Sequence, residues 1–131
     1  MDEIHLNVFN CFSIAAMEAA MTDCDEWMRQ FRSYCYRNCQ FVQQYLKQNM
    51  PKITASLPKA TTLMWVDFSQ IAESANQARD FCIACGVLLS SGTDFCNRAG
   101  VFCRLNVGSP LSVLKEALER IKAGYDVLEK E

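Results

Sequence analysis

Hydrophobic positions recur with a helical period over the first fifty residues of the chain. Large apolar side chains stand mostly three or four residues apart, as they do on the buried face of an α-helix. This pattern predicts a helix over residues 8–21 and a second helix that is capped by Thr22 or Asp23 and stopped by Pro51. The second helix would be about 27 residues, or about 40 Å, long. Helices of that length often extend across two domains, which hints that part of the surrounding structure is missing from this chain.

Beyond Pro51 apolar and polar residues alternate, which is typical of half-buried strands. The alternation predicts four short strands, over residues 52–56, 61–68, 87–90 and 101–107. A helix between the second and third strands opens on a capping box, Ser74 with Gln77, and ends at Gly86. The last helix begins with Ser109 as its N-cap and Pro110 as its first residue. Its packing face is predicted to consist of Leu114, Ala117, Leu118, Ile121, Tyr125 and Leu128.

The predicted order of elements is helix, helix, strand, strand, helix, strand, strand, helix. This order favours an α+β fold of two layers, in which a small sheet is covered by helices and preceded by the long helix. The chain of 131 residues is long enough for one domain, and no repeat or linker divides it. We therefore expect a single domain over residues 1–131.

Composition and charge narrow the classes of function. Half of the residues are hydrophobic and 21% are charged, as in globular proteins, and the net charge of −2 gives no electrostatic footprint for nucleic acid. No apolar run approaches the roughly 20 residues that cross a bilayer, and the acidic start of the sequence lacks the features of a secretion signal. We expect a cytoplasmic protein without nucleic-acid or membrane partners.

Eight cysteines raise the alternative of a thiol or zinc protein. Cys82 and Cys85 form a C-x-x-C pair, and Cys35 and Cys39 could complete a set of four thiolate ligands. However, the C-x-x-C pair falls at the C-terminal end of a predicted helix, where the helix dipole does not lower a thiol pKa. His5 is the only histidine that could join a zinc site. Reduced cysteines that pack as small hydrophobic residues are the favoured interpretation.

Arg104 lies at the centre of the last predicted strand and is the main candidate for chemistry. Alternation places Val101, Cys103, Leu105 and Val107 on one face of this strand and Phe102, Arg104 and Asn106 on the other. A guanidinium among apolar residues is costly to desolvate unless it meets an anion, and its planar fork matches a carboxylate. From spacing alone, an arginine that reaches the surface or pairs with an Asp or Glu of its own chain is the more common outcome.

Other catalytic patterns are absent or coincidental. No Ser-His-Asp set can be built around His5, and no glycine-rich phosphate loop occurs. Ser56 and Lys59 match the S-x-x-K pattern, but a proline in a predicted turn separates them, which favours coincidence. Asp67 stands on an alternating strand and is as readily structural as functional. Taken alone, the residues predict an α+β domain with one possible anion-binding arginine.

Several blocks of sequence, in the same order, resemble the C-terminal small domain of fold-type I pyridoxal phosphate (PLP) enzymes. The resemblance is to the class I/II aminotransferase family, and most of all to its cystathionine β-lyase (MalY/PatB) branch. It covers residues 8–125 and is carried by residues 7–20 with Glu26-Trp27, residues 41–47 with 50–53, Leu63-Met-Trp-Val-Asp-Phe68, Gly86-Val-Leu-Leu-Ser-Ser-Gly92, and Arg104-Leu-Asn106 with Pro110. The chain departs from the branch at Ala60, Thr62 and Cys96, where glycine, an aromatic residue and glycine are common.

The resemblance implies an enzyme that acts on amino acids, either a transferase or a lyase. Arg104 occupies the position at which the family binds the α-carboxylate of its substrate. The Schiff-base lysine, the aspartate that pairs with the pyridine nitrogen and the phosphate cradle belong to the large domain in this family, and none of the six lysines here stands in an S-x-S-K context. The resemblance therefore implies PLP for a full-length enzyme, no cofactor held by this chain alone, and no catalysis by it.

A non-enzymatic interaction module remains as an alternative. If the large domain is absent, the apolar flank of the helix over residues 8–21 and part of the long helix should be exposed. Such a surface predicts a homo-oligomer formed through these helices, or a partner chain that supplies the missing domain.

Overall fold

The computed structural model describes residues 10–96 and 100–130 of the chain. Contacts divide the chain into two compact units, Met1–Tyr34 and Cys35–Glu131, and each unit is described by itself. The expectation of one domain over residues 1–131 stays a prediction.

The first unit consists of helix α1, Cys11–Thr22, and the start of helix α2, Asp25–Asn49. α1 begins after Asn10, whose side-chain Oδ1 accepts a hydrogen bond from the amide of Ser13 at 2.8 Å. Thr22 ends α1 and Asp23 is its C-cap, whereas α2 begins at Asp25, so the prediction that Thr22 or Asp23 caps α2 is wrong by one or two residues. The reason is that α1 continues through Thr22. The first two residues of the predicted helix lie outside the described residues.

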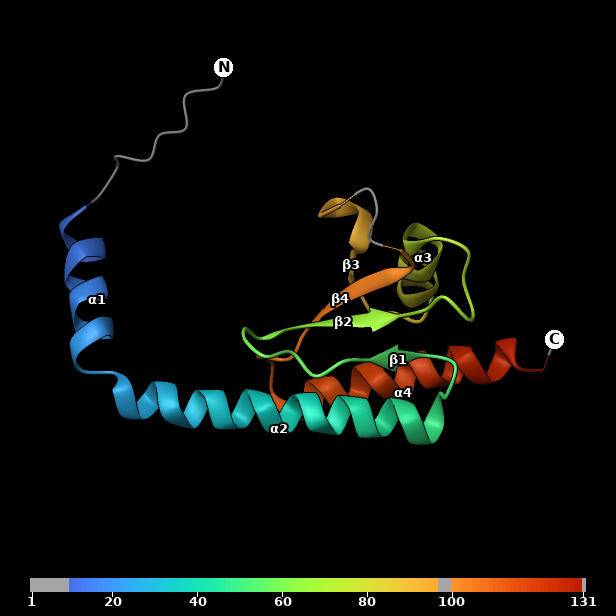
Figure 1. The fold of residues 1–131 in the computed structure, drawn as a ribbon, viewed down its shortest axis with the longest axis horizontal. Helices are drawn as coiled ribbons and strands as arrows, with labels where there is room; N and C mark the ends of the chain where they lie inside the picture. The colour runs from blue at the N-terminus through green and yellow to red at the C-terminus, as the bar shows by residue number, and fades with distance from the viewer. Residues whose placement is uncertain (1–9, 97–99, 131) are drawn as a thin grey trace, which may run out of the picture. The chain divides into compact units, whose positions relative to one another are not determined.

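The second unit contains a sheet of four antiparallel strands, which Figure 1 shows above α2 and α4. The strands are β1 (Thr54–Ala55), β2 (Leu63–Asp67), β3 (Ser90–Ser91) and β4 (Phe102–Asn106). Their order in the sheet is β1-β2-β4-β3. β4 therefore lies between two neighbours, and its Arg104 is paired with Trp65 of β2 and with Ser90 of β3.

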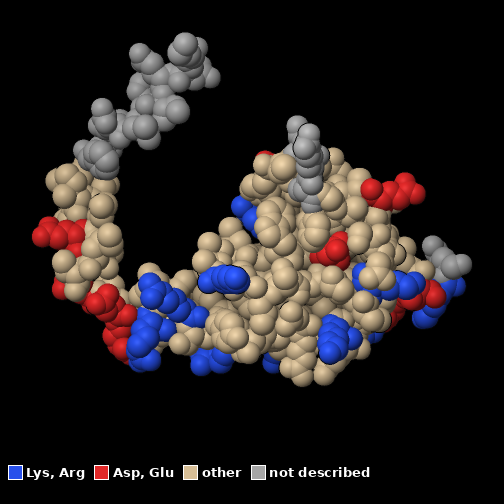
Figure 2. Space-filling view, viewed as in Figure 1, with Lys and Arg blue, Asp and Glu red and all other residues tan. Residues whose placement is uncertain are grey.

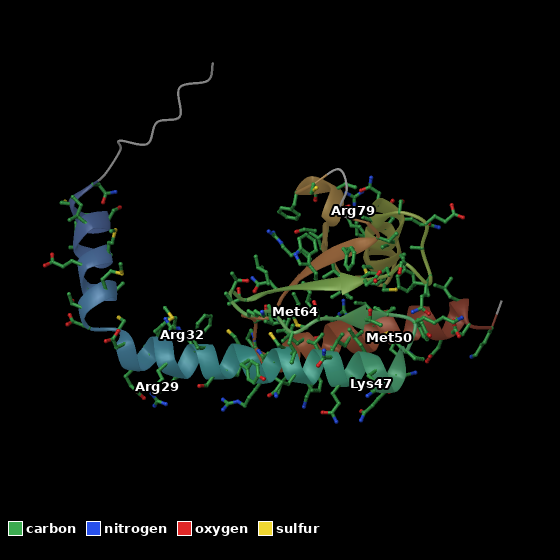
Figure 3. The ribbon with its side chains drawn as sticks, in the orientation of Figure 1. Arg29, Arg32, Lys47, Met50, Met64 and Arg79 are labelled. Carbon is green, nitrogen blue, oxygen red and sulfur yellow. The ribbon has the colours of Figure 1, made fainter. Side chains whose placement is uncertain are left out.

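Helices cover one face of this sheet and create the core of the second unit. They are the second half of α2, α3 (Ala75–Ala84) and α4 (Leu111–Leu128), and Figure 1 shows α2 and α4 running along each other. Alternate residues of β2 and β4 point into the core, and Met64 of β2 is completely buried, as is Met50 just after α2 (Figure 3). The predicted order of elements and the α+β fold class are confirmed.

The third strand and the start of the last helix differ from their predicted bounds. The third strand is only Ser90–Ser91, because residues 87–89 form a loop after α3 and pairing with β4 begins at Ser90. α4 begins at Leu111, with Pro110 as its N-cap and no side-chain cap, so Ser109 is not the N-cap. Of the residues predicted as its packing face, Leu114, Leu118, Ile121 and Tyr125 are buried, whereas Leu128, near the end of the helix, is exposed.

Charge is spread thinly over the second unit. In the view of Figure 2 most of its surface is uncharged, and the Lys and Arg side chains are separated from one another. Among residues 10–96 and 100–130, no helix is both long enough and apolar enough to cross a membrane.

Candidate functional site

Arg104 lies in the middle of β4 and projects from the face of the sheet that the helices leave uncovered. Its neighbours Cys103 and Leu105 are buried in the core, so the alternation of β4 turns Arg104 to the opposite face. The Arg104 side chain is half-buried there. The prediction that Phe102, Arg104 and Asn106 share a face opposite to the core is confirmed.

Two groups hold the guanidinium of Arg104. Its Nη2 donates a hydrogen bond to the hydroxyl oxygen of Ser90 at 3.3 Å. Its Cζ lies 4.2 Å from the centre of the Phe95 ring, within the range of a cation–π interaction. None of the ion pairs among the described residues includes Arg104. The described part of the chain thus gives this guanidinium a hydroxyl and an aromatic ring, while its fork suits an external carboxylate.

Three aromatic side chains, Trp65, Phe95 and Phe102, form a rim beside Arg104. The Trp65 ring meets the Phe95 ring edge-on with 5.7 Å between centroids, and the Phe102 ring with 6.5 Å. Trp65 is 39% exposed and Phe95 is 49% exposed. The rim therefore offers apolar ring surface to anything that approaches the arginine from the open face of the sheet.

A hollow of about 280 Å³ lies beside Arg104, between the sheet and the start of α4. Its polar lining comes from Ser90, Arg104, Asn106 and Ser109, and its other lining residues are apolar. The Asn106 Oδ1 accepts a hydrogen bond from the amide of Gly108 at 2.9 Å, which fixes the turn from β4 toward α4. A small ligand with a carboxylate could be placed here with its charge on the guanidinium and its remainder against apolar walls.

A polar cluster behind the rim fixes the segment that carries Phe95. The segment is the short helix η1, Gly92–Asp94, and Phe95 is its C-cap. The Asn76 Oδ1 of α3 accepts hydrogen bonds from the hydroxyls of Ser91 at 2.9 Å and Thr93 at 3.1 Å. No candidate residue was predicted between the strands expected over residues 87–90 and 101–107, so this cluster and Phe95 were missed. The run of hydroxyl residues around Gly92 was the available signal.

The residues around Arg104 do not fit PLP as a covalently held cofactor. None of the six lysines of the chain lines the hollow, and among the described residues no acidic side chain that could pair with a pyridine nitrogen lines it either. Lys52 is instead bonded to Glu129 at 2.8 Å, and Lys122 to Asp126. No step through PLP is therefore derived from the side chains of this chain.

The four cysteines considered as zinc ligands are free thiols, and burial raises the pKa of each one. Cys82 lies within α3 and Cys85 is its C-cap, as predicted. Within the described ranges, no group of three or more His, Cys, Asp or Glu side chains is arranged to hold a metal ion. A raised pKa keeps these thiols protonated at neutral pH, which disfavours thiolate chemistry at Cys35, Cys39, Cys82 or Cys85.

The remaining sequence candidates lie apart from Arg104. The Asp67 Oδ1 accepts a hydrogen bond from the Ser69 amide at 2.8 Å, and this bond gives the carboxylate a structural role at the end of β2. Ser56 and Lys59 lie in the connection between β1 and β2. His5 lies outside the described residues.

Comparisons with known proteins show which enzymes this chain is similar to. The chain is 32% identical over 119 residues to cystathionine beta-lyase PatB of Bacillus subtilis (strain 168), a match that covers 90% of this chain and 31% of PatB. No family model matches the chain.

Solved structures give the same result. A PLP-bound protein of Clostridium difficile 630, assigned as an aminotransferase, superposes with a TM-score of 0.83 and 35% identity, over 88% of this chain and 30% of that one. Cystalysin of Treponema denticola, which contains PLP, superposes with a TM-score of 0.86 and 26% identity, over 92% of this chain and 31% of cystalysin. The resemblance found in the sequence is confirmed, and the chain spans less than a third of the length of these relatives.

Proposed function

We propose that this chain is the substrate-carboxylate-binding part of a PLP-dependent aminotransferase or carbon–sulfur β-lyase that acts on amino acids. The observation that carries the proposal is the half-buried Arg104, which is held by Ser90 and Phe95 on an open sheet face and has no ion-pair partner among the described residues. The likeness to PatB and to PLP-bound structures supports it.

Arg104 would bind the α-carboxylate of the amino acid through two parallel N–H···O bonds and so fix the orientation of the substrate. PLP, when bound in such enzymes, withdraws electrons from the α-carbon of the amino acid. The aromatic rim would exclude water from one side of the bound substrate. A segment or partner chain corresponding to the rest of the relatives would supply the lysine and hold the cofactor.

We expect this chain alone to be inactive, because its site has no lysine. The test adds PLP and cystathionine to the purified chain and measures both turnover and a borohydride-stable PLP adduct on one lysine. Turnover together with a single modified lysine would contradict the proposal that the catalytic lysine is supplied by a segment other than this chain.

Carboxylate binding at Arg104 is tested directly by titrating the chain with acetate while the Arg104 Nε–Hε signal is followed by NMR. Acetamide has nearly the same shape without the charge and serves as the matched ligand control. We expect a saturable shift with acetate and none with acetamide. We also expect loss of the response in the R104Q variant. Equal responses to both ligands would refute Arg104 as a carboxylate site.

A cytoplasmic location is part of the proposal. Four cysteines, Cys35, Cys39, Cys82 and Cys103, are buried free thiols, which fits a reducing compartment. Oxidation of these thiols in protein isolated under air-free conditions would argue against that location.

A second candidate function is a self-associating interaction module. Its support is α1, which has no buried residue and carries large apolar side chains that are more than half exposed, namely Phe12, Ile14, Met17 and Met21. Apolar surface of this kind drives association. This function would operate without a catalytic partner. It predicts an oligomer of the chain whose assembly does not respond to acetate or to a change at Arg104.

A further inference from the structure

We propose that Phe95 is a positioning residue that fixes the plane of the Arg104 guanidinium, and that Asn76, Ser91 and Thr93 hold the Phe95 ring in place. The inference rests on the proposed function, since it concerns how Arg104 is prepared for a carboxylate. The sequence predicted only Arg104 for this site, and the inference adds the Phe95 ring and the polar side chains that support it.

The first argument is the geometry of the guanidinium. An arginine side chain has several rotatable bonds, so its fork must be held before it can present two parallel donors. The Phe95 ring lies 4.2 Å from the Arg104 Cζ, and a ring against one face of the guanidinium restricts the plane of the fork. The bond from Nη2 to the Ser90 hydroxyl restricts rotation within that plane. The two restraints together leave the other edge of the fork for a ligand.

The second argument is the exposure of Phe95. A phenylalanine that served only to fill the core would be buried, but this side chain is 49% exposed. Within the described residues, its ring lies against the Arg104 guanidinium and packs nearly perpendicular to the Trp65 ring. Phe95 is therefore placed against the arginine and the rim instead of against the core.

The third argument is the support beneath the ring. The Phe95 amide donates a hydrogen bond to the carbonyl oxygen of Gly92 at 3.1 Å, which attaches the backbone of Phe95 to the η1 turn. That turn is tied to α3, because Asn76 Oδ1 lies within hydrogen-bond distance of the hydroxyls of Ser91 and Thr93, whose oxygens lie 2.8 Å from each other. Ser91 is completely buried. A functional group held through a regular helix is more precisely placed than one carried by an unsupported loop.

The experiment measures the order of the Arg104 side chain in the complete, ligand-free chain. Nitrogen-15 relaxation of the Arg104 Nε–Hε group is compared in the wild type, F95L, F95Y and T93V. F95L removes the aromatic face and keeps an apolar side chain, whereas F95Y keeps the ring. The matched control is F102L, because Phe102 also contacts Trp65 and shares the face of Arg104, but the ring that lies over the guanidinium is that of Phe95.

We expect F95L to lose the upfield ring-current shift of Arg104 and to lower the order of its Nε–Hε group, and T93V to lower that order by a smaller amount. F95Y and F102L should retain the wild-type order. In an acetate titration, F95L should bind about twofold to fivefold more weakly than the wild type, the range that corresponds to an exposed cation–π contact. F95Y should bind as the wild type does.

Unchanged order in F95L would overturn the proposal, and so would an equal loss of order in F95L and F102L. These outcomes do not depend on acetate. If Arg104 is ordered by Phe95 but the wild type gives no saturable response to acetate, the positioning by the ring is supported and the proposed carboxylate function fails. The two proposals are thereby tested separately.

Discussion

Thr61 holds a backbone conformation that β-branched residues rarely adopt. Its φ is 70°, in the left-handed region, and it lies in the connection that leads into β2. Asparagine tolerates this region better, and its side-chain oxygen can replace the Thr61 hydroxyl that accepts from the Leu63 amide at 3.2 Å. We expect Thr61→Asn to raise the free energy of unfolding by about 0.5–1 kcal/mol. Urea unfolding measures the change, with Thr62→Asn as the control that should give no gain.

The buried thiol of Cys103 predicts a loss of stability in alkali. Burial raises the pKa of Cys103 to about 11 from an ordinary value near 9. As the pH rises, the Cys103 thiol loses its proton at a lower pH in the unfolded chain than in the folded one. The stability that this thiol contributes is therefore intact below about pH 9 and declines as the pH rises toward 11. A difference of this size corresponds to about 2–3 kcal/mol in the free energy of unfolding.

Urea midpoints between pH 8 and 11 measure this decline. Cys103→Ala is the control, because the alkaline decline should become shallower in that variant even though the smaller side chain lowers stability at every pH. Parallel declines in the two proteins would show that Cys103 is not the titrating group.

At the scale of single residues, strand alternation was sufficient to place Arg104 on the face opposite to Cys103 and Leu105. It could not identify Ser90 and Phe95 as the neighbours of the guanidinium. These two residues come from segments that precede β4, and they approach Arg104 only because β3 pairs with β4 at the sheet edge. Pairing of this kind depends on the whole sheet, whereas alternation is a property of one strand.

Gly124 marks the place where α4 approaches α3 most closely. A Cβ atom at this position would overlap the Cys85 Sγ and lie 3.2 Å from Cε2 of Phe81. Glycine to alanine normally stabilises a helix interior by about 1 kcal/mol. Here the overlap should make the substitution destabilising, and we expect Gly124→Ala to lower the free energy of unfolding by about 1–3 kcal/mol.

A double-mutant cycle checks the cause. Cys85→Ala removes the overlapping sulfur, so the Gly124→Ala change should cost less in that background than in the wild type. Thermal or urea unfolding of the four proteins gives the coupling. A cost that is the same in both backgrounds would show that the close approach of Cys85 does not determine the role of Gly124.

At the scale of elements, signals that act within a few residues predicted the structure best. Ser74 caps α3 by accepting from the Gln77 amide at 3.2 Å, and Gly86 ends that helix region with φ of 75°. The Gln77 side chain bonds the Glu73 amide instead of the Ser74 amide, a variation on the predicted capping box. Of the strand predicted over residues 87–90, only Ser90 belongs to β3, because Val87 and Leu89 are buried without pairing with β4.

At the scale of the whole molecule, the order of elements was predictable and the site was predictable only in part. The fold class could be predicted because it depends on the order of helical and strand segments along the chain. That order stays the same when each boundary is wrong by a few residues. A site built from distant segments leaves no such pattern in the sequence, and the chain spans only 31% of a relative such as PatB. Arg104 was therefore predictable as a candidate for carboxylate binding, while Ser90 and Phe95, which contact its guanidinium, were not.

Self-association of the chain is expected to depend on α1. Glu18 is the only charged residue between Cys11 and Thr22, and α1 has no buried residue. Met17 is well exposed and has an apolar side chain, so a charge at this position should oppose the burial of α1 against a second copy. We expect Met17→Glu to weaken self-association by roughly tenfold to a hundredfold, the range that corresponds to the burial of one large apolar side chain.

Sedimentation velocity over a wide range of protein concentration measures this effect. Glu18→Gln is the matched control, because it changes the neighbouring residue without adding a charge to the apolar surface, and its association should be at least as strong as that of the wild type. A wild-type chain that stays a monodisperse monomer at every concentration would exclude self-association. Equal association of Met17→Glu and the wild type would move the contact away from α1, since an unpaired carboxylate buried in an apolar interface cannot be neutral in free energy.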